Sequence, residues 1–141
     1  MSDPSVSCEI SASLNLCGGA FDFEHCSKAI GVAATSTWTR KIEHDAIPEA
    51  SWSIGFDKRP YDCVDVAVSA VLEQVEGLEE RVRAYAKAQA LEVSLSCDVF
   101  IYKQRPLYSL SPATMKRLSE LHAEFRLDIF DYSPCDCEAT E

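Results

Sequence analysis

The sequence predicts an α+β fold, a two-layer sandwich in which helices pack on one face of a mainly antiparallel sheet. One long segment, residues 62–90, has its apolar side chains on a single helical stripe. Three shorter segments alternate apolar and polar residues, which is typical of strands with one apolar face. These apolar surfaces are buried by packing against each other, so the second face of the sheet is left open to water.

The long helical segment is expected to break near its middle. Its stripe consists of Val64, Val68, Val71, Val75, Leu78, Val82 and Tyr85. A straight helix of 29 residues would be about 43 Å long, whereas a compact chain of this size is only about 37 Å across. Gly77 frees the backbone to turn and costs about 1 kcal/mol relative to alanine inside a helix. We therefore expect two shorter helices or one bent helix, with the same face turned inward.

The strands are predicted mainly from period-two alternation. Within residues 7–17 the even-numbered side chains are apolar, and within residues 92–101 the odd-numbered ones are apolar. These side chains are expected to lie beneath the helices. Further strands are expected at residues 35–42, 50–56, 107–110 and 125–132.

Capping signals mark two further helices. Asp22 is the expected N-cap of a helix over residues 23–30 that Gly31 closes. Ser111 and Pro112 are typical of a helix start, here of a helix over residues 113–123. That helix is expected to bury Met115, Leu118 and Leu121, and residues 43–49 are expected to form a loop.

The order of these elements hints at an internal duplication. A strand, a loop, a short capped helix and a strand occur at residues 7–42 and again at residues 93–132. The similarity is one of pattern and not of residue identity, and such elements are ferredoxin-like. We expect one α+β domain over residues 1–132 and a loose acidic tail over residues 133–141.

Composition excludes several classes of function. The chain has 23 acidic and 13 basic residues, a net charge of -10, which argues against a nucleic-acid-binding surface. No apolar run approaches the roughly 20 residues that span a bilayer, so no membrane insertion is expected. The seven cysteines are odd in number and residues 1–20 lack a signal-peptide pattern. These features favour the cytoplasm, where Cys8 and Cys97 would act as small buried hydrophobes.

Four segments together resemble a known family: GGAFDFEHCSKAIGVAATSTW, ASWSIGF, LEVSLSCDVFIY and LSPATMKRLSELHAEFRLDIFDY. In this order around a helical middle they are similar to the bacterial family called "domain of unknown function 4279". The features that carry the resemblance are Gly31, Thr35 and Trp38, the pair Trp52-Ser53, residues 110–112, and Asp128-Ile129. Ala34 stands where the family often has proline. The resemblance spans about Ser11 to Tyr132 and implies a family fold, no established activity and no catalytic residues to carry over.

No metal or cofactor is expected. The pair Cys135 and Cys137 could hold a soft metal, but zinc takes four ligands and the sequence has no second pair of this kind. His25-Cys26 or His122 would have to be recruited by folding. The glycine pair at Gly18 lacks the pattern of a phosphate-binding loop.

No catalytic residue is expected either. His25, His44 and His122 could each act as a general base, yet no GxSxG elbow marks a nucleophile beside one of them. The simpler interpretation is that these are surface histidines.

The face of the sheet opposite the helices is the most informative feature. It is expected to be a small, polar, mildly acidic platform, and its candidate interaction residues are Glu9, Ser11, Ser13, Ser94, Ser96, Asp98, Arg126 and Asp128. Phe100, Phe130 and Tyr132 fall near its edge, where exposed aromatic side chains favour a protein contact or a homodimer. Trp38 belongs either to this face or to the core.

Two functions remain open from the sequence. The first is a non-catalytic protein-interaction module, for instance an immunity protein against a basic toxin, that uses the open acidic face. The alternative is a small-ligand-binding protein, or an enzyme of unknown reaction, with a cleft near Gly18 to His25.

Overall fold

The computed structural model describes residues 6–40 and 49–134. Within these residues the chain forms five strands and four helices. In chain order they are β1 (Cys8–Gly19), α1 (Phe23–Ile30), β2 (Ser36–Arg40), β3 (Glu49–Arg59), α2 (Val64–Glu73), α3 (Glu79–Ala88), β4 (Glu92–Ile101), α4 (Pro112–Glu120) and β5 (Glu124–Asp131).

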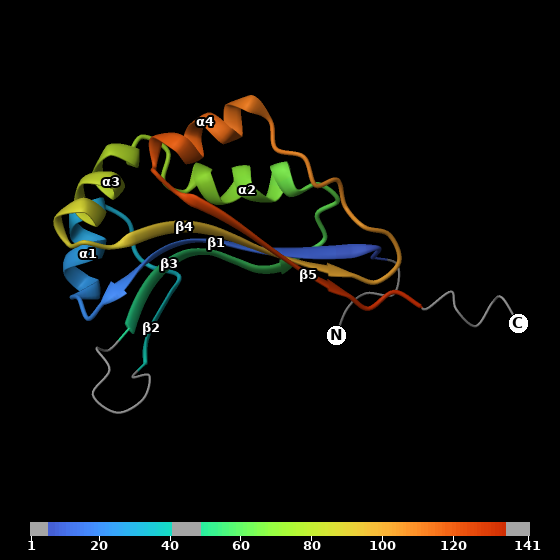
Figure 1. The fold of residues 1–141 in the computed structure, drawn as a ribbon, viewed down its shortest axis with the longest axis horizontal. Helices are drawn as coiled ribbons and strands as arrows, with labels where there is room; N and C mark the ends of the chain where they lie inside the picture. The colour runs from blue at the N-terminus through green and yellow to red at the C-terminus, as the bar shows by residue number, and fades with distance from the viewer. Residues whose placement is uncertain (1–5, 41–48, 135–141) are drawn as a thin grey trace, which may run out of the picture.

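The strands form one sheet in the order β2-β3-β1-β4-β5. Three of the four pairings are antiparallel, and β4 pairs with β5 in parallel because α4 carries the chain back between them. Figure 1 shows α2 and α4 on one side of the sheet, with α1 and α3 around one end. The predicted α+β fold is confirmed. None of the helices in the described residues has the length and apolar content needed to cross a bilayer.

The predicted parity of the two central strands is confirmed. The even-numbered side chains of β1 and the odd-numbered side chains of β4 are buried. They pack against the inward face of α2, which contributes Val64, Val68 and Val71. The core therefore lies between the sheet and the helices, and the other face of the sheet carries the polar residues.

The predicted break in the long helical segment is also confirmed. Helix α2 ends at Glu73 and α3 begins at Glu79. Gly77 lies between them with a φ of 80°, a left-handed conformation that favours glycine. Val75 and Val82 on either side of the turn are fully buried, so both helices keep their apolar stripe inward.

Both predicted caps are present. The Asp22 carboxylate accepts a hydrogen bond from the His25 backbone N–H at 3.1 Å, and Gly31 closes α1 with a φ of 99°. The Ser111 hydroxyl accepts from the Thr114 N–H at 3.2 Å, with Pro112 in the first turn of α4.

The inward face of α4 differs from the prediction. Met115 is 51% exposed, whereas Leu118, Leu121 and Thr114 are buried. Thr114 is satisfied there because its hydroxyl lies 3.3 Å from that of Ser69 on α2. The hydroxyl of the N-cap Ser111 also donates to that of Thr114 at 3.0 Å. The inward face of α4 thus includes a hydrogen-bonded threonine, whereas Met115 points outward.

One further expectation is corrected, and two others are refined. The short strand at residues 107–110 is only an isolated bridge between Cys63 and Leu107. The strand at residues 35–42 is observed over Ser36–Arg40, and residues 41–48 lie outside the described part of the chain. The two halves of the suggested duplication differ in topology, because β3 separates β1 from β2 whereas β4 and β5 are direct neighbours.

Candidate interaction face

We call the side of the sheet that faces away from the helices the open face. Because strand side chains alternate, its members follow from the strand register. They are Ser36, Trp38 and Arg40 on β2, Ser51, Ser53 and Gly55 on β3, Glu9, Ser11, Ser13, Asn15 and Cys17 on β1, Glu92, Ser94, Ser96, Asp98 and Phe100 on β4, and Glu124, Arg126, Asp128 and Phe130 on β5. The fold thus brings all eight predicted interaction residues to one surface.

Asn15 is the centre of a hydrogen-bond network in the middle of the open face. Its Oδ1 accepts from the hydroxyls of Ser53 at 2.7 Å and Ser13 at 2.9 Å. Its Nδ2 lies 3.1 Å from the Ser96 hydroxyl and 3.4 Å from that of Ser94. One amide therefore links three neighbouring strands through short side chains.

This network changes the expected surface at one position. Ser94 is only 5% exposed, and Ser51 and Ser53 on β3 are buried as well. Their side chains are short, and each hydroxyl has a hydrogen-bond partner: Ser94 and Ser53 bond the Asn15 amide, and the hydroxyls of Ser51 and Ser53 lie 3.4 Å apart. Ser94 is therefore part of the floor of the open face and contributes little accessible surface of its own.

Asp98 and Asp128 form an acidic pair on this face. They lie directly opposite each other in the parallel pairing of β4 and β5. Burial and the nearby Asp128 charge raise the pKa of Asp98, while a hydrogen bond from Ser11 acts against this shift. Among the described residues the ion pairs are Arg40–Glu49 and Arg126–Glu124, so neither aspartate has a cationic partner there.

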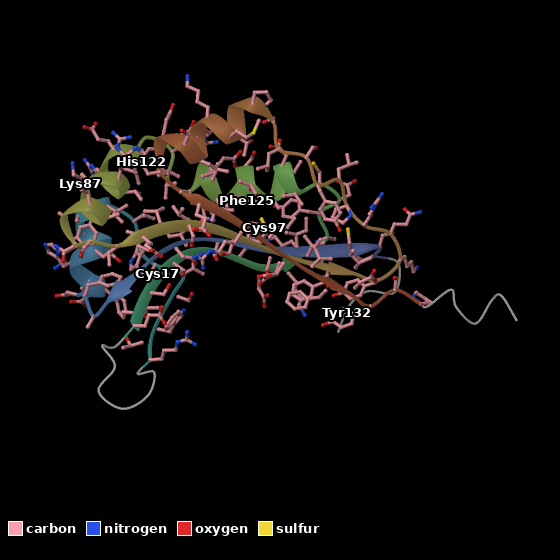
Figure 2. The ribbon with its side chains drawn as sticks, viewed as in Figure 1. Cys17, Lys87, Cys97, His122, Phe125 and Tyr132 are labelled. Atoms are coloured by element: carbon pink, nitrogen blue, oxygen red, sulfur yellow. The ribbon has the colours of Figure 1, made fainter. Side chains whose placement is uncertain are left out.

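Aromatic side chains cover one end of the open face. Phe100 and Phe130 stack with ring centroids 5.2 Å apart, and the Lys58 ammonium lies 4.4 Å from the centroid of the Phe100 ring. Tyr132 stacks on Tyr102 at 6.3 Å, and Figure 2 shows Tyr132 at the C-terminal end of β5. Phe130 remains 42% exposed, which leaves this cluster available for contact.

Trp38 lies at the opposite edge of the open face. It pairs with Ser51 in the register of β2 and β3 and is 43% exposed. The question that the sequence left open is therefore answered: Trp38 belongs to the surface and not to the core. A hollow of about 310 Å³ lies nearby, lined by Ser11, Ser13, Thr35, Ser36, Ser53, Gly55, Phe56 and Asp57.

The residues of the alternative site near Gly18 to His25 have structural partners. The Asp22 carboxylate caps α1, and the His25 Nδ1 lies 3.4 Å from the Tyr85 hydroxyl. The hydroxyl of Ser27, on the same helix, accepts a hydrogen bond from the Trp52 indole at 2.9 Å. Each of these three side chains thus has a different partner.

Of the other metal and base candidates, His122 lies within the described residues. His122 is exposed after α4, while His44, Cys135 and Cys137 lie outside the described residues. Within residues 6–40 and 49–134 no group of three or more His, Cys, Asp or Glu side chains could hold a metal ion.

A cleft that no sequence motif indicates lies at the end of the molecule near α3. It has a volume of about 550 Å³, and its lining residues are Glu80, Arg83, Ala84, Ala86, Lys87, Leu91, Glu92, Val93, Leu121, His122 and Glu124. These come from α3, the start of β4, the end of α4 and the start of β5, so no local motif could indicate them. Figure 2 shows Lys87 and His122 at this end.

A family model for a domain of unknown function, DUF4279, matches residues 8–132. The chain belongs to the DUF4279 family. This match confirms the resemblance found in the sequence, and it includes every helix and strand described above. No curated protein and no solved structure matches the chain. The DUF4279 assignment names no activity, so a function has to be argued from the open face and the cleft.

Proposed function

We propose that this DUF4279 protein is a non-catalytic protein-interaction module whose open face binds a basic protein. The acidic pair Asp98 and Asp128 is the observation that carries the proposal. Two carboxylates lie side by side on an accessible sheet face, and neither forms an ion pair with a described residue, since the nearby Arg126 is paired with Glu124. A lysine or arginine from a partner would offset their repulsion, which makes a cation the ligand that this pair favours.

The charge of the whole chain supports the same class of partner. With a net charge of -10, the protein attracts basic molecules over several ångströms before contact. Such steering raises the association rate and suppresses binding of acidic competitors. The acidic composition alone would serve solubility. The local pair Asp98 and Asp128 is what indicates where on the surface a basic partner would bind.

The shape of the open face is also suited to a protein contact. Its floor is made of short, hydrogen-bonded side chains around Asn15, which admit close approach of a partner. Trp38 stands at one edge and Phe130 at the other, and exposed aromatic residues are enriched in protein interfaces. An immunity protein that neutralises a basic toxin in the cytoplasm is one role of this kind.

The test is capture of a partner followed by measurement with purified components. Tagged wild-type protein, the double variant Asp98→Asn/Asp128→Asn and the control Glu73→Gln/Glu76→Gln would be incubated with lysate from the native cell. Glu73 and Glu76 are exposed on the helix side, so the control removes the same charge from the other face. Any captured protein would then be purified and its Kd measured by calorimetry at several salt concentrations.

We expect a basic partner whose binding weakens as the salt concentration rises. Its Kd should be at least tenfold higher for the Asp98→Asn/Asp128→Asn variant than for the wild type, and less than twofold higher for the control. Recovery of background proteins only would count against the proposal. So would a partner that binds the two double variants equally.

The cleft near α3 supports a second candidate function, the binding of a small ligand. Its volume of about 550 Å³ lies within the range of ligand sites. The floor contains the buried side chains of Val93 and Leu121, while Lys87 and Glu92 bring opposite charges to the walls. A small zwitterion with an apolar side chain, such as an amino acid or dipeptide, matches this lining.

Thermal shift measurements with free amino acids and dipeptides test this second candidate. A ligand that binds the folded state raises Tm in a concentration-dependent way. Lys87→Gln should abolish that shift, whereas Lys28→Gln on exposed α1 should not. No shift at millimolar concentration with any of these compounds would remove the candidate.

A further inference from the structure

Strand β5 forms one edge of the sheet, and apart from its charged side chains this edge lacks the usual protection against pairing. Its eight residues, EFRLDIFD, contain neither proline nor lysine. They pair with β4 in an unbroken register from Glu124 to Asp131, without a bulge. In Figure 1 β5 crosses in front of the other strands with no helix or strand in front of it. Natural edge strands are normally short, bulged, charged with lysine or covered.

The backbone of β5 offers hydrogen bonds outward. The N–H of Tyr132 donates to the carbonyl of Ile101 at 2.7 Å, so even-numbered residues of this strand direct their backbone groups toward β4. In a parallel ladder these directions alternate along the strand. Phe125, Leu127 and Ile129 therefore direct N–H and C=O away from β4. No strand in the described part of the chain pairs with them.

The apolar side chains of this edge are also incompletely covered. Phe125, Leu127 and Ile129 lie on the face toward the helices, yet none of them is buried, and Ile129 is 50% exposed. By comparison, the other edge strand β2 has five residues, STWTR, with threonines on that same face. The β5 edge is the longer and more apolar of the two.

We propose that β5 pairs antiparallel with β5 of a second copy of this chain, about a twofold axis at Leu127. In this register Leu127 lies opposite Leu127 of the second copy. Arg126 lies opposite Asp128 and Phe125 lies opposite Ile129, and the symmetry makes each of these pairs occur twice. The sequence of the strand is thus complementary to itself in charge and in apolar character.

Hydrogen-bond geometry restricts the alternatives. Only registers that place odd-numbered residues opposite odd-numbered residues bring the outward backbone groups together, so the axis must pass through a residue and not between two. With the axis at Leu127, this residue and Leu127 of the second copy form a hydrogen-bonded pair, in which each N–H donates to the carbonyl of the other. Arg126 and Asp128 then form the non-hydrogen-bonded pairs, in which the side chains of the two strands are closest.

Charge selects among the remaining registers. An axis at Asp128 would place the two Asp128 side chains opposite each other. An axis at Arg126 would do the same for the two arginines and would place Glu124 opposite Asp128. Like charges directly opposite each other are destabilising. An axis at Ile129 overlaps over as many residues as one at Arg126 and places Asp128 opposite Phe130. Of these four registers, the one at Leu127 alone has opposite charges in contact.

The second copy would also supply the missing cation of the acidic pair. Asp128 has Asp98 on its β4 side. In the proposed dimer Arg126 of the second copy lies on its other side, and so offsets the repulsion within the pair. The two sheets would join into one, with both helical layers on the same side. This inference does not depend on the proposed basic partner, which would compete with the second copy for Asp128.

A charge-exchange experiment tests the proposed register. Arg126→Asp alone creates two Asp–Asp pairs across the axis, and Asp128→Arg alone creates two Arg–Arg pairs. Each single variant should dimerise at least tenfold more weakly than wild type in sedimentation equilibrium. Mixed in equal amounts, the two variants should form a heterodimer, because every cross pair is then of opposite charge. The double variant Arg126→Asp/Asp128→Arg should recover the homodimer.

Controls and a second readout separate this dimer from general charge effects. Arg105→Asp and Glu76→Arg change the net charge by the same amounts at exposed positions off the strand and should leave dimerisation unchanged within twofold. The Leu127 amide should exchange slowly in the wild type and quickly in Arg126→Asp, while the Asp128 amide, bonded to β4, is protected in both. A wild type that stays monomeric at 1 mM, or single variants that fail to associate when mixed, would overturn the proposal.

Discussion

Asp98 and Asp128 lie directly opposite each other on the parallel strands β4 and β5, and the pKa of Asp98 is raised by burial and by the charge of Asp128. A carboxyl whose pKa is higher in the folded state binds its proton more tightly there than in the unfolded chain. Stability then falls as pH rises from the ordinary pKa of 3.8 through the folded value. At neutral pH the ionised pair therefore opposes folding.

The first prediction follows from that sign. Asp98→Asn removes the charge and should raise the free energy of unfolding at pH 7 by a few tenths of a kcal/mol to about 1 kcal/mol, the small figure reflecting solvent screening of a half-exposed pair. Denaturant titrations at pH 3 and pH 7 measure it. At pH 3 the variant and the wild type should agree.

The matched control is Glu76→Gln, which removes an exposed acid from the helix side and should leave the pH profile unchanged. If Asp98→Asn were less stable than the wild type at pH 7, the carboxylate would be stabilising, contrary to the direction of its pKa shift.

The second prediction concerns the amide at the centre of the open face. Asn15→Ala deletes the acceptor of the Ser53 hydroxyl and the donor to the Ser96 hydroxyl. Because Ser53 and Ser94 are buried, their polar groups would lose partners that water cannot fully replace. We expect a loss of about 2 kcal/mol, measured by urea unfolding. Ser36→Ala on the same face, at an exposed position, should cost less than about 0.5 kcal/mol.

The sequence could predict most of the fold because alternation and helical spacing report burial directly. The apolar side chains at every second position are buried as expected, from Cys8 to Leu16 on β1 and from Val93 to Ile101 on β4. Gly77 could be identified as the helix break because a helix of that length would not fit a compact chain. Asp22 and Ser111 could be identified as caps because capping depends on local sequence alone.

Features that depend on long-range contacts could not be predicted. Thr114 is buried and Met115 exposed because α4 packs against α2, where the Thr114 hydroxyl lies 3.3 Å from that of Ser69 in addition to its local bond from Ser111. Ser94 is buried because Asn15, far away in sequence, lies against it on the next strand. The parallel pairing of β4 and β5 and the cleft lined by Lys87 and His122 likewise arise from elements distant in the chain.

The third prediction separates two roles of glycine. A Cβ on Gly55 would lie 2.1 Å from the Ala12 carbonyl oxygen of the paired strand, so Gly55→Ala must displace backbone in the sheet. A Cβ on Gly77 would meet nothing within 4 Å, and only the positive φ of 80° opposes it. We expect Gly77→Ala to cost about 1 kcal/mol and Gly55→Ala on the order of 3 kcal/mol or more, with reduced soluble yield. Equal costs in thermal unfolding would contradict this distinction.

The fourth prediction uses the thiols to check the buried face of the sheet. Burial raises the pKa of Cys26 and Cys97 to about 12, and both are inaccessible in the core. At pH 8 only about one such thiol in ten thousand is ionised, and the thiolate is the reactive form. Iodoacetamide should therefore label the partly exposed Cys17 and Cys63 in the folded protein and reach Cys26 and Cys97 only in denaturant, as peptide mass spectrometry would measure. Because Cys97 shares its strand face with Val93 and Ile101, native labelling of Cys97 as fast as Cys63 would mean that the odd-numbered side chains of β4 are not beneath the helices. The even-numbered residues, Asp98 among them, would then lose their place on the open face.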